Sequence, residues 1–298
     1  MIKADLHLHT TCSDGEYSPS QMVAVTADLG CEQISVTDHD TISGVAAAVA
    51  EGDKLGVEVI PGIEITLRFL REFFTGSLHL LVYFPRHLLE NTQFTEGLHR
   101  VVSAGRGKAL VQKRVERINE EFGPLGKNPL LGSLLTVESI TSLAENVSRR
   151  HFAKALSSVH GLSKQQISLL IGNSSPAYVP SGVDLELVAP LIARWPVVPV
   201  LAHPAAGSFP GESHYKEVLP PFSTVKKILP EFLKAGLKGL EVYYPGHTSE
   251  HMAELLDIAR EYGLAVTGGS DCHDRIERPA GTAGLSCPLD FNRLFQPV

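Results

Sequence analysis

The stretch ADLHLHTTCSDG at residues 4–15 ends an apolar run on His7 and His9 and places Asp14 just beyond them. In a β-strand, residues i and i+2 face the same side, so we expect the two imidazoles to project together. Two adjacent imidazoles repel each other when both are protonated, and a metal ion bound by both removes that conflict. An isolated HxH pair is often an ordinary pair of surface or core histidines, so the rest of the chain has to decide.

The bulk composition is that of a globular protein. With 298 residues and 43% hydrophobic side chains, the chain is long enough for one large domain or a domain with an insertion. The start, MIKADLHLH, has no long apolar run, which predicts neither a secretory signal nor a membrane span. The four cysteines form no CxxC pair, which favours a reducing cytoplasmic location over a disulfide framework or a zinc knuckle.

Charge is distributed unevenly along the chain. The net charge of −7 argues against a surface that coats nucleic acid. Residues 96–180 hold 11 Lys+Arg against 6 Asp+Glu, whereas the remainder holds 15 against 27. An acidic body suits cation binding and a basic segment suits an anionic substrate, although such an asymmetry is weak evidence by itself.

Apolar, β-branched runs alternate with helical patterns. Ser18-Pro19 opens one helical pattern and Gly30 ends it, and Gly56, Gly236 and Gly263 end others. Alternation of this kind with nearly all-apolar strands predicts an α/β fold with a parallel sheet, and seven strands indicate a (β/α)7 barrel. The seven predicted strands are 2–9, 32–37, 57–66, 77–84, 197–202, 238–244 and 264–270.

The central part of the chain breaks this alternation. It reads as one long charged helix near 92–122, followed by shorter helical pieces. We therefore expect a helical insertion between two barrel strands, which serves as a substrate cap. The predicted organisation is a first barrel part at 1–87, the helical insertion at 88–182 and a second barrel part at 183–298; the shorter pieces are 136–146, 149–159 and 163–171.

Metal-competent side chains follow the predicted strands. In a parallel barrel the loops after the strands build the active site, so residues far apart in sequence can converge there. A lone His203 before proline or a lone Glu64 is usually a capped or solvated residue, but the full set is hard to explain in that way. His79 comes early in its run, so that strand either runs in another direction or begins sooner. The set is His7, His9, Asp14, Asp38, His39, Glu64, His79, His203, Asp271 and His273.

Six motifs carry a family resemblance. DLHLHTTCSDG, TDHDT, GIEI, HLLVYF, LAHP and GSDCHD, in this order, resemble the PHP (polymerase and histidinol phosphatase) family over about 1–84 and 183–298. The resemblance implies a distorted seven-stranded barrel with two or three divalent metal ions. It is strongest to bacterial nucleoside 3′,5′-bisphosphate phosphatases and 5′-to-3′ exoribonucleases, whose helical insertion carries a pattern like VSRRHFA at 147–153.

The resemblance also implies how the metals divide the ligands. Glu64 would bridge two ions, and Asp14 stands where some relatives have histidine. A harder oxygen ligand there favours manganese or iron over zinc. HPAAG in place of the commoner HPG-Arg and Cys272 within the last motif are mild departures that concern substrate fit. The implied sets are His7, His9, Glu64 and Asp271 for the first ion, Glu64, His79 and His203 for the second, and Asp14, His39 and His273 for the third.

The function implied is hydrolysis of a nucleotide-type phosphate ester by a metal-activated hydroxide. The substrate would be a nucleoside 3′,5′-bisphosphate or a 5′-phosphorylated oligoribonucleotide. Glu64, His39, His273 and Asp38 would be catalytic: His39 and His273 would relay a proton to the leaving oxygen, and Asp38 would support them from outside the ligand set. Two alternatives stay open: a phosphatase for histidinol phosphate or another small phosphomonoester, and a non-catalytic, metal-stabilised binding module.

Four residues are candidates for binding the substrate. Arg149 and His151 match the insertion motif of the family, and the planar guanidinium of arginine can donate two hydrogen bonds to one phosphate. His247, in the loop after the sixth predicted strand, and Arg106 are further candidates. The expected partner is a small phosphorylated molecule, a nucleotide or a short RNA end, with neither a membrane nor a stable protein partner.

Overall fold

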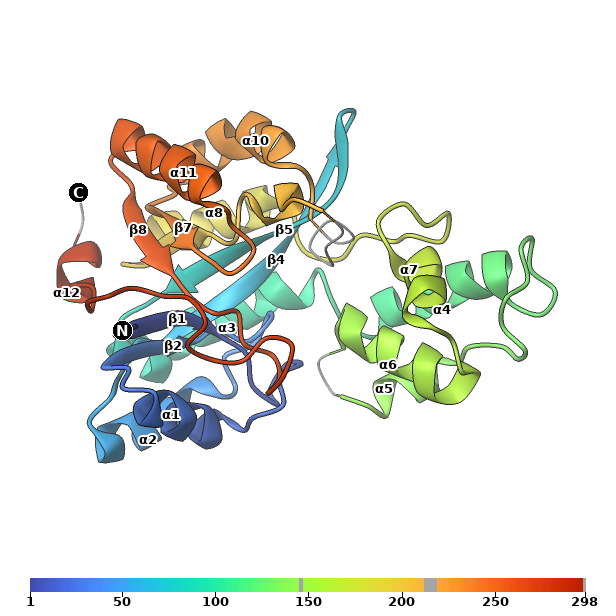
Figure 1. The fold of residues 1–298 in the computed structure, drawn as a ribbon, viewed down its shortest axis with the longest axis horizontal. Coiled ribbons are helices and arrows are strands. Elements are labelled where there is room, and N and C mark those ends of the chain that lie inside the picture. Colours follow the sequence, from blue (N-terminus) through green and yellow to red (C-terminus); the bar gives the residue numbers. More distant parts are fainter. Residues whose placement is uncertain (145–146, 212–218, 297–298) are drawn as a thin grey trace.

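The computed structural model describes residues 1–144, 147–211 and 219–296, and its strands form two sheets (Figure 1). The smaller sheet is parallel and consists of β1 (Ala4–Leu8), β2 (Gln33–Val36) and β3 (Glu58–Val59), in that order. The larger sheet has five strands in sequence order: β4 (Gly62–Arg71), β5 (Phe74–Tyr83), β6 (Val198–Leu201), β7 (Gly239–Tyr243) and β8 (Ala265–Gly268).

The prediction of an α/β fold is confirmed, but a closed seven-stranded parallel barrel is not found in the described ranges. The predicted strand 57–66 is divided between β3 and β4 around Pro61, which has no N–H for a sheet ladder. β5 pairs antiparallel with both β4 and β6. The two sheets touch through isolated parallel bridges, one between Leu8 and Cys272 and the other between His39 and Glu64.

The antiparallel hairpin explains the position of His79. β5 begins at Phe74, earlier than the sequence predicts, and runs opposite to β4, with His79 paired to Thr66. His79 therefore lies in the middle of β5, beside Thr66 in the first half of β4. This orientation brings His79 to the same region as Glu64.

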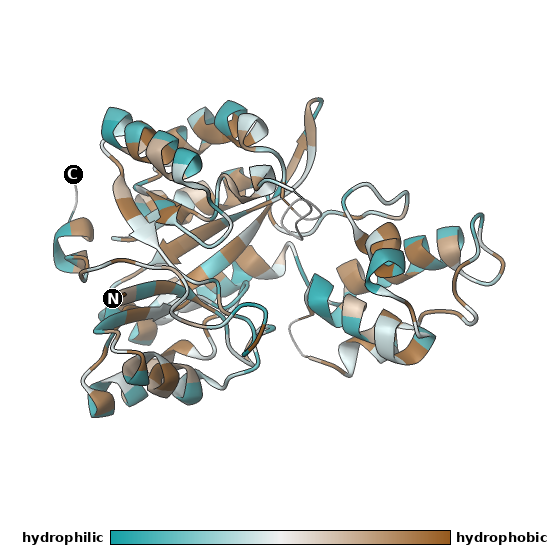
Figure 2. Ribbon diagram, in the orientation of Figure 1, coloured by the Kyte–Doolittle hydropathy of each residue, from teal (hydrophilic) through white to brown (hydrophobic). Residues whose placement is uncertain are grey.

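Helices cover the outer faces of both sheets (Figure 1). α1 and α2 pack beside the smaller sheet, and their apolar residues Met22 and Ala48 share a core with β1 and β2. α10 and α11 lie over the larger sheet and alternate hydrophobic and hydrophilic residues along their length (Figure 2), as expected for helices with one buried face. Throughout the described ranges, each helix is too short or too polar to cross a membrane. The bounds are α1 (Pro19–Asp28), α2 (Val45–Leu55), η1 (Arg86–Glu90), α3 (Thr92–Ser103), α8 (Leu185–Arg194), η2 (Ala206–Ser208), α10 (Phe222–Lys234), α11 (Ser249–Tyr262) and α12 (Phe291–Leu294).

Four further helices form the helical segment, which lies to one side of both sheets (Figure 1). They pack around apolar residues of their own, among them Ile118, Phe152 and Leu170. They are α4 (Lys108–Phe122), α5 (Val137–Thr141), α6 (Arg149–His160) and α7 (Lys164–Ile171).

The single long helix predicted near 92–122 is wrong, because the chain breaks between α3 and α4. Gly107 there has a left-handed φ of 96°, and a Cβ on Gly105 would lie 2.3 Å from the carbonyl carbon of Gly182. α3 consequently packs with the larger sheet, where Phe94 and Leu98 are buried. The division of the chain at 88 and 182 stays a prediction, and the end of the predicted piece 136–146, residues 145 and 146, lies outside the described residues.

Gly182 is the return point of the helical segment. Its N–H donates to Gly105 O at 3.1 Å, its φ is +102°, and an added Cβ would lie 2.4 Å from Thr66 O. We expect Gly182→Ala to lower the free energy of unfolding by about 1–3 kcal/mol, the scale for a strained backbone residue, measured by urea denaturation. The matched control is Gly107→Ala, which has a φ of +96° but no atom within 4 Å of the new Cβ. An equal loss in the two variants would mean that the close approach to Thr66 contributes nothing.

Candidate functional site

Strands β1, β4 and β5 and the loops that follow several strands bring the nine predicted metal ligands together, with Glu64 at the centre. Glu64 lies in β4 with no exposed surface, and five imidazole nitrogens surround its carboxylate. Oε1 lies 3.3 Å from His7 Nε2, 3.0 Å from His79 Nδ1 and 3.2 Å from His203 Nε2. Oε2 lies 3.2 Å from His9 Nε2 and 2.8 Å from His39 Nδ1. One carboxylate at the centre of five imidazoles is the arrangement expected of a bridging ligand.

Two more carboxylates complete the cluster. Asp271, just after β8, places Oδ1 3.1 Å from His9 Nε2 and 3.4 Å from His7 Nε2. Asp14, in the loop after β1, places Oδ1 3.3 Å from His273 Nε2. The ligand atoms of three groups lie within 4.8 Å of one another: His9, Asp14, His39 and His273; His7, His9 and Asp271; and His39, Glu64 and His79.

Unsatisfied polar atoms show that these residues fit divalent metal ions. His7 Nε2, His9 Nε2, His79 Nδ1, Asp14 Oδ1 and Glu64 Oε2 are buried and have no hydrogen-bond partner among the described residues. Buried polar atoms of native proteins are almost always paired, so a cluster of five exceptions points to a ligand. Imidazole and carboxylate ligands without cysteine are typical of hydrolytic metal sites. The number and identity of the metals, two or three ions of Mn, Fe or Zn, stay predictions.

Ring hydrogen bonds orient two of the imidazoles. Because a carboxylate only accepts, His7 Nδ1 donates to Glu241 Oε1 at 2.9 Å, which leaves the Nε2 lone pair directed at the cluster. His273 Nδ1 likewise donates to Asp271 O at 2.8 Å, so its Nε2 lone pair faces Asp14. These are the tautomers that a metal ligand requires.

The electrostatics of the cluster favour cations. Burial raises the pKa of Glu64, but the imidazoles of His79, His39 and His7 outweigh burial and hold the pKa well below its usual range. Burial alone lowers the pKa of His9, yet contacts with Asp271 and Glu64 raise it to about 9. The same carboxylates that favour a cation on this ring would favour a bound divalent ion, which requires the neutral imidazole.

Three residues of the site region adopt left-handed backbone conformations that L-residues rarely take. The φ angles are 51° for Asp40, 32° for His203 and 52° for Asp271. Each amide is held: Asp40 N donates to Glu64 O, Asp271 N to His7 O and His203 N to Glu241 Oε2, at 2.8–2.9 Å. Backbone strain that persists in this way concentrates at functional sites.

Asp38 is predicted to support the proton relay from outside the ligand set, and its contacts are with the loop after β1. Its Oδ1 accepts from Thr10 N at 2.7 Å and from Ser13 Oγ at 2.5 Å, and its Oδ2 accepts from Thr10 Oγ1 at 2.7 Å. The carboxylate of Asp38 thus fixes the loop between His9 and Asp14 through Thr10 and Ser13. In this position Asp38 orients ligands, whereas His39 and His273 lie in the cluster.

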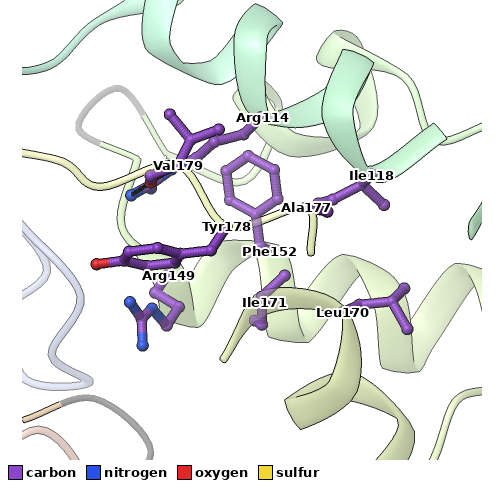
Figure 3. Close-up of a pocket in the computed structure, with 9 residues that line it drawn as sticks. All are labelled: Arg114, Ile118, Arg149, Phe152, Leu170, Ile171, Ala177, Tyr178 and Val179. Carbon is purple, nitrogen blue, oxygen red and sulfur yellow. Dashed lines mark hydrogen bonds between the residues drawn. The ribbon is translucent and has the colours of Figure 1, made fainter. Parts of the chain in front are cut away.

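A cleft of about 1410 Å³ joins the cluster to the helical segment. The two predicted substrate residues Arg149 and His151 line it from the first turn of α6. Arg149 donates to Asn173 Oδ1 at 2.9 Å, and its guanidinium lies 5.6 Å from the centre of the Tyr178 ring. In Figure 3 the guanidinium of Arg149 and the hydroxyl of Tyr178 point away from Leu170 and Ile118, which belong to the apolar interior of the segment.

The other two predicted substrate residues have structural partners. His247 is buried, its Nδ1 donates to Val242 O at 2.9 Å, and its Nε2 accepts from Ala205 N at 3.1 Å. Both ring nitrogens are therefore already used by the backbone. Arg106 lines the cleft but also donates to Asp40 and to Val147 O, which ties the loop after β2 to the start of α6.

Glu241 is a site residue that the sequence motifs do not reveal. It lies in β7 as the one charged residue between Gly239 and Tyr243, and this isolated charge in an apolar run is the signal that could have identified it. Its two oxygens accept from His7 Nδ1 and His203 N, so it orients two ligands at once.

We expect Glu241→Gln to weaken Mn²⁺ binding by about 10- to 100-fold, the range for residues that orient metal ligands. The glutamine amide has only one acceptor oxygen for two donors, so His7 or His203 N faces an NH₂ group. Equilibrium dialysis with Mn²⁺ measures the change. The control, Glu254→Gln, removes an exposed ion pair with Lys226; equal affinity in both variants would show that Glu241 does not orient the ligands.

Comparison with known proteins identifies a family and several relatives. The PHP domain family matches residues 5–161. A 5′-3′ exoribonuclease of Haemophilus influenzae is 26% identical, over 99% of this chain and 97% of its own length. A phosphoribosyl 1,2-cyclic phosphate 1,2-diphosphodiesterase of Eggerthella lenta is 28% identical over 92% of this chain and 95% of its own. A 3′,5′-nucleoside bisphosphate phosphatase of Chromobacterium violaceum is 24% identical over 92% and 88%, respectively.

The fold has a close structural counterpart. An inferred metal-dependent phosphoesterase from Bifidobacterium adolescentis superimposes with a TM-score of 0.72 at 24% identity, covering 97% of this chain and 94% of that protein. At this identity the likeness shows the fold alone. The family match, by contrast, spans more than half of the chain, and the three relatives are all named for the hydrolysis of phosphate esters. The chain therefore belongs to the PHP domain family and is a hydrolase that acts on ester bonds.

Proposed function

We propose that this protein is a metal-dependent phosphoesterase whose substrate is a nucleoside 3′,5′-bisphosphate or a 5′-phosphorylated oligoribonucleotide. One observation carries the proposal: the metal-ligand cluster and the first turn of α6, with Arg149 and His151, line the same cleft. A ligand held between them would need an ester phosphate at the cluster and a second anionic group at the helical segment. The exoribonuclease and bisphosphate phosphatase relatives act on molecules of that kind.

The cluster supplies the reaction centre. Divalent metals bound there would activate water for attack on phosphorus and neutralise charge on the phosphate. Glu64 contributes oxygens to both sides of the cluster, and Glu241 and the backbone of Asp271 hold His7 and His273 in the required tautomers. Burial lowers the pKa of His273 to about 3, so its ring stays neutral at physiological pH. His39, which lies partly open to the cleft, is the better placed residue to move a proton.

The helical segment supplies the second contact. Arg149 begins α6, where Ser148 caps the helix, so its guanidinium lies at the positive end of the helix dipole. The ring of Tyr178 and the amide of Asn173 restrict its orientation. His151 accepts from Ser148 N through Nδ1 at 3.0 Å and is fixed on the same turn. A rigid arginine at a helix N-terminus is well suited to bind phosphate.

A hydrolysis screen with purified, manganese-loaded protein tests the proposal. Inorganic phosphate is measured for the phosphomonoesters, and chromatography of the products is used for RNA and for the cyclic phosphate, because cleavage of a phosphodiester frees no inorganic phosphate. The panel contains a nucleoside 3′,5′-bisphosphate, short 5′-phosphorylated RNA, histidinol phosphate and phosphoribosyl 1,2-cyclic phosphate. We expect the highest kcat/KM on one of the first two and loss of activity on chelation. A preference for histidinol phosphate would transfer the assignment to small phosphomonoesters, and metal binding without turnover of any ester would support a binding module.

A further inference from the structure

Arg278 lies at the metal end of the cleft, although no sequence motif singles it out. It follows β8 in the loop that also carries Asp271 and His273, and it lines the cleft with a side chain that is 20% exposed. Its Nη1 donates to Asp271 Oδ2 at 3.0 Å, and the other oxygen of Asp271 faces His7 and His9. The carboxylate of Asp271 therefore lies between the guanidinium of Arg278 and the imidazoles of His7 and His9.

Holding Asp271 does not require this positive charge. Tyr244 Oη donates to the same oxygen, Oδ2, at 2.8 Å, and Asp271 N is fixed by His7 O at 2.9 Å. A neutral donor and the backbone thus already orient the carboxylate. What Arg278 adds beside Asp271 is a positive charge that lines the cleft.

The loop that carries Arg278 is rigidly placed. Asp274 Oδ1 accepts from the backbone N–H groups of Ile276, Glu277 and Arg278, at 3.0, 2.5 and 3.0 Å. Asp274 Oδ2 accepts from Arg150 of the helical segment at 3.3 Å. Arg278 O in turn accepts from His273 N at 3.2 Å. The guanidinium is thereby preorganised with respect to the cluster, as electrostatic catalysis requires.

Charge balance shows what a fixed cation would do there. The cluster offers three carboxylates, Asp14, Glu64 and Asp271, and two divalent ions carry more charge than these neutralise. Asp271 lies between this positive centre and the guanidinium of Arg278, and a further anion in the cleft would be attracted by both. A phosphate group has the charge and the oxygen atoms to contact both, and arginine binds it through parallel hydrogen bonds.

We propose that Arg278 is a catalytic residue that donates hydrogen bonds to the non-bridging oxygens of the phosphate undergoing hydrolysis. The proposal rests on the proposed function only in that the substrate is a phosphate ester. It assigns Arg278 to the reacting group, whereas Arg149 is assigned to the distant one. Replacing Arg278 is then expected to slow the hydrolysis of every phosphate ester that the enzyme accepts.

The test compares Arg278→Ala and Arg278→Lys with wild type on a two-phosphate substrate and on its one-phosphate counterpart. We expect Arg278→Ala to lower kcat by about 100- to 1,000-fold on both substrates, the range for removing one preorganised donor, and lysine to recover part of the loss. Manganese content by elemental analysis should stay at the wild-type level. Binding of inorganic phosphate to the manganese-loaded protein, by calorimetry, should weaken at least about tenfold.

The control is Arg275→Ala, on the same loop, whose guanidinium lies 4.8 Å from the centre of the Tyr17 ring and outside the cleft; activity and phosphate binding should stay within about twofold of wild type. Lost manganese in Arg278→Ala would overturn the proposal, because Arg278 would then only position Asp271. A loss confined to the two-phosphate substrate would overturn it as well. Wild-type protein that hydrolyses no phosphate ester refutes the proposed function instead, while the phosphate-binding comparison still decides the role of Arg278.

Discussion

Replacing Glu64 with Gln is expected to remove at least one metal ion per chain and to lower kcat/KM by about 1,000-fold or more. This loss exceeds the roughly 10- to 100-fold that is typical when a residue that only orients a metal ligand is replaced. The two oxygens of Glu64 face five imidazole nitrogens, three on Oε1 and two on Oε2. The amide of glutamine places an NH₂ group on one of these sides and removes the charge that attracts cations to both. Replacing a ligand that bridges two ions is thus expected to reduce metal binding more than replacing a ligand to a single ion.

Elemental analysis after manganese-supplemented expression measures the first effect, and phosphate release measures the second. Glu231→Gln is the control, since it changes the same group in a partly exposed ion pair with Arg71. The melting temperature shows whether the fold is kept. Full metal content in Glu64→Gln would contradict the bridging role, and less than one metal ion per wild-type chain would contradict the metal centre as a whole.

Arg149→Ala is expected to lower kcat/KM for a two-phosphate substrate by about 2–4 kcal/mol, which corresponds to roughly 30- to 1,000-fold. The loss is large because the side chain is held in place by Tyr178 and Asn173, so a bound phosphate gains a preorganised partner. A phosphomonoester without the second phosphate should change by less than about threefold, since it does not reach α6.

The steady-state comparison of the two substrates is the measurement. Arg117→Ala provides the control, because Arg117 belongs to the helical segment but pairs with Glu120 at its surface, away from the cleft. Equal losses on both substrates would mean that Arg149 serves the reacting phosphate or the fold. The bisphosphate assignment would then lose its main support.

Local signals in the sequence were sufficient to predict most of the candidate site. Apolar runs that end in histidine or aspartate predict strands with polar ends, and the structure brings His9, His203 and Asp271, which follow β1, β6 and β8, together with Glu64 of β4. These predictions depend only on the residue period and on where each run ends, which a short stretch determines. The metal-binding roles themselves stay predictions until ions are measured.

The architecture was harder to predict, because hydrophobic runs carry no information about direction or partner. The run that contains His79 is equally apolar in either orientation, and only pairing with β4 shows that it runs antiparallel. The break between α3 and α4 depends on the contact of Gly105 with Gly182, 77 positions later in the sequence. Glu241 and Arg278 acquire their meaning only from the atoms they face.

The junction at Gly105 and Gly182 has a consequence for how such enzymes diversify. Gly105, after α3, and Gly182, before α8, lie side by side and are joined by one hydrogen bond. All nine candidate metal ligands lie outside the stretch between these two glycines. Recombination at this point could exchange one helical segment for another of different length without displacing a single ligand. Specificity could therefore change by grafting while the hydrolytic centre is inherited intact, with the contacts of Arg106 to Asp40 and of Arg150 to Asp274 among the connections that each new graft must re-create.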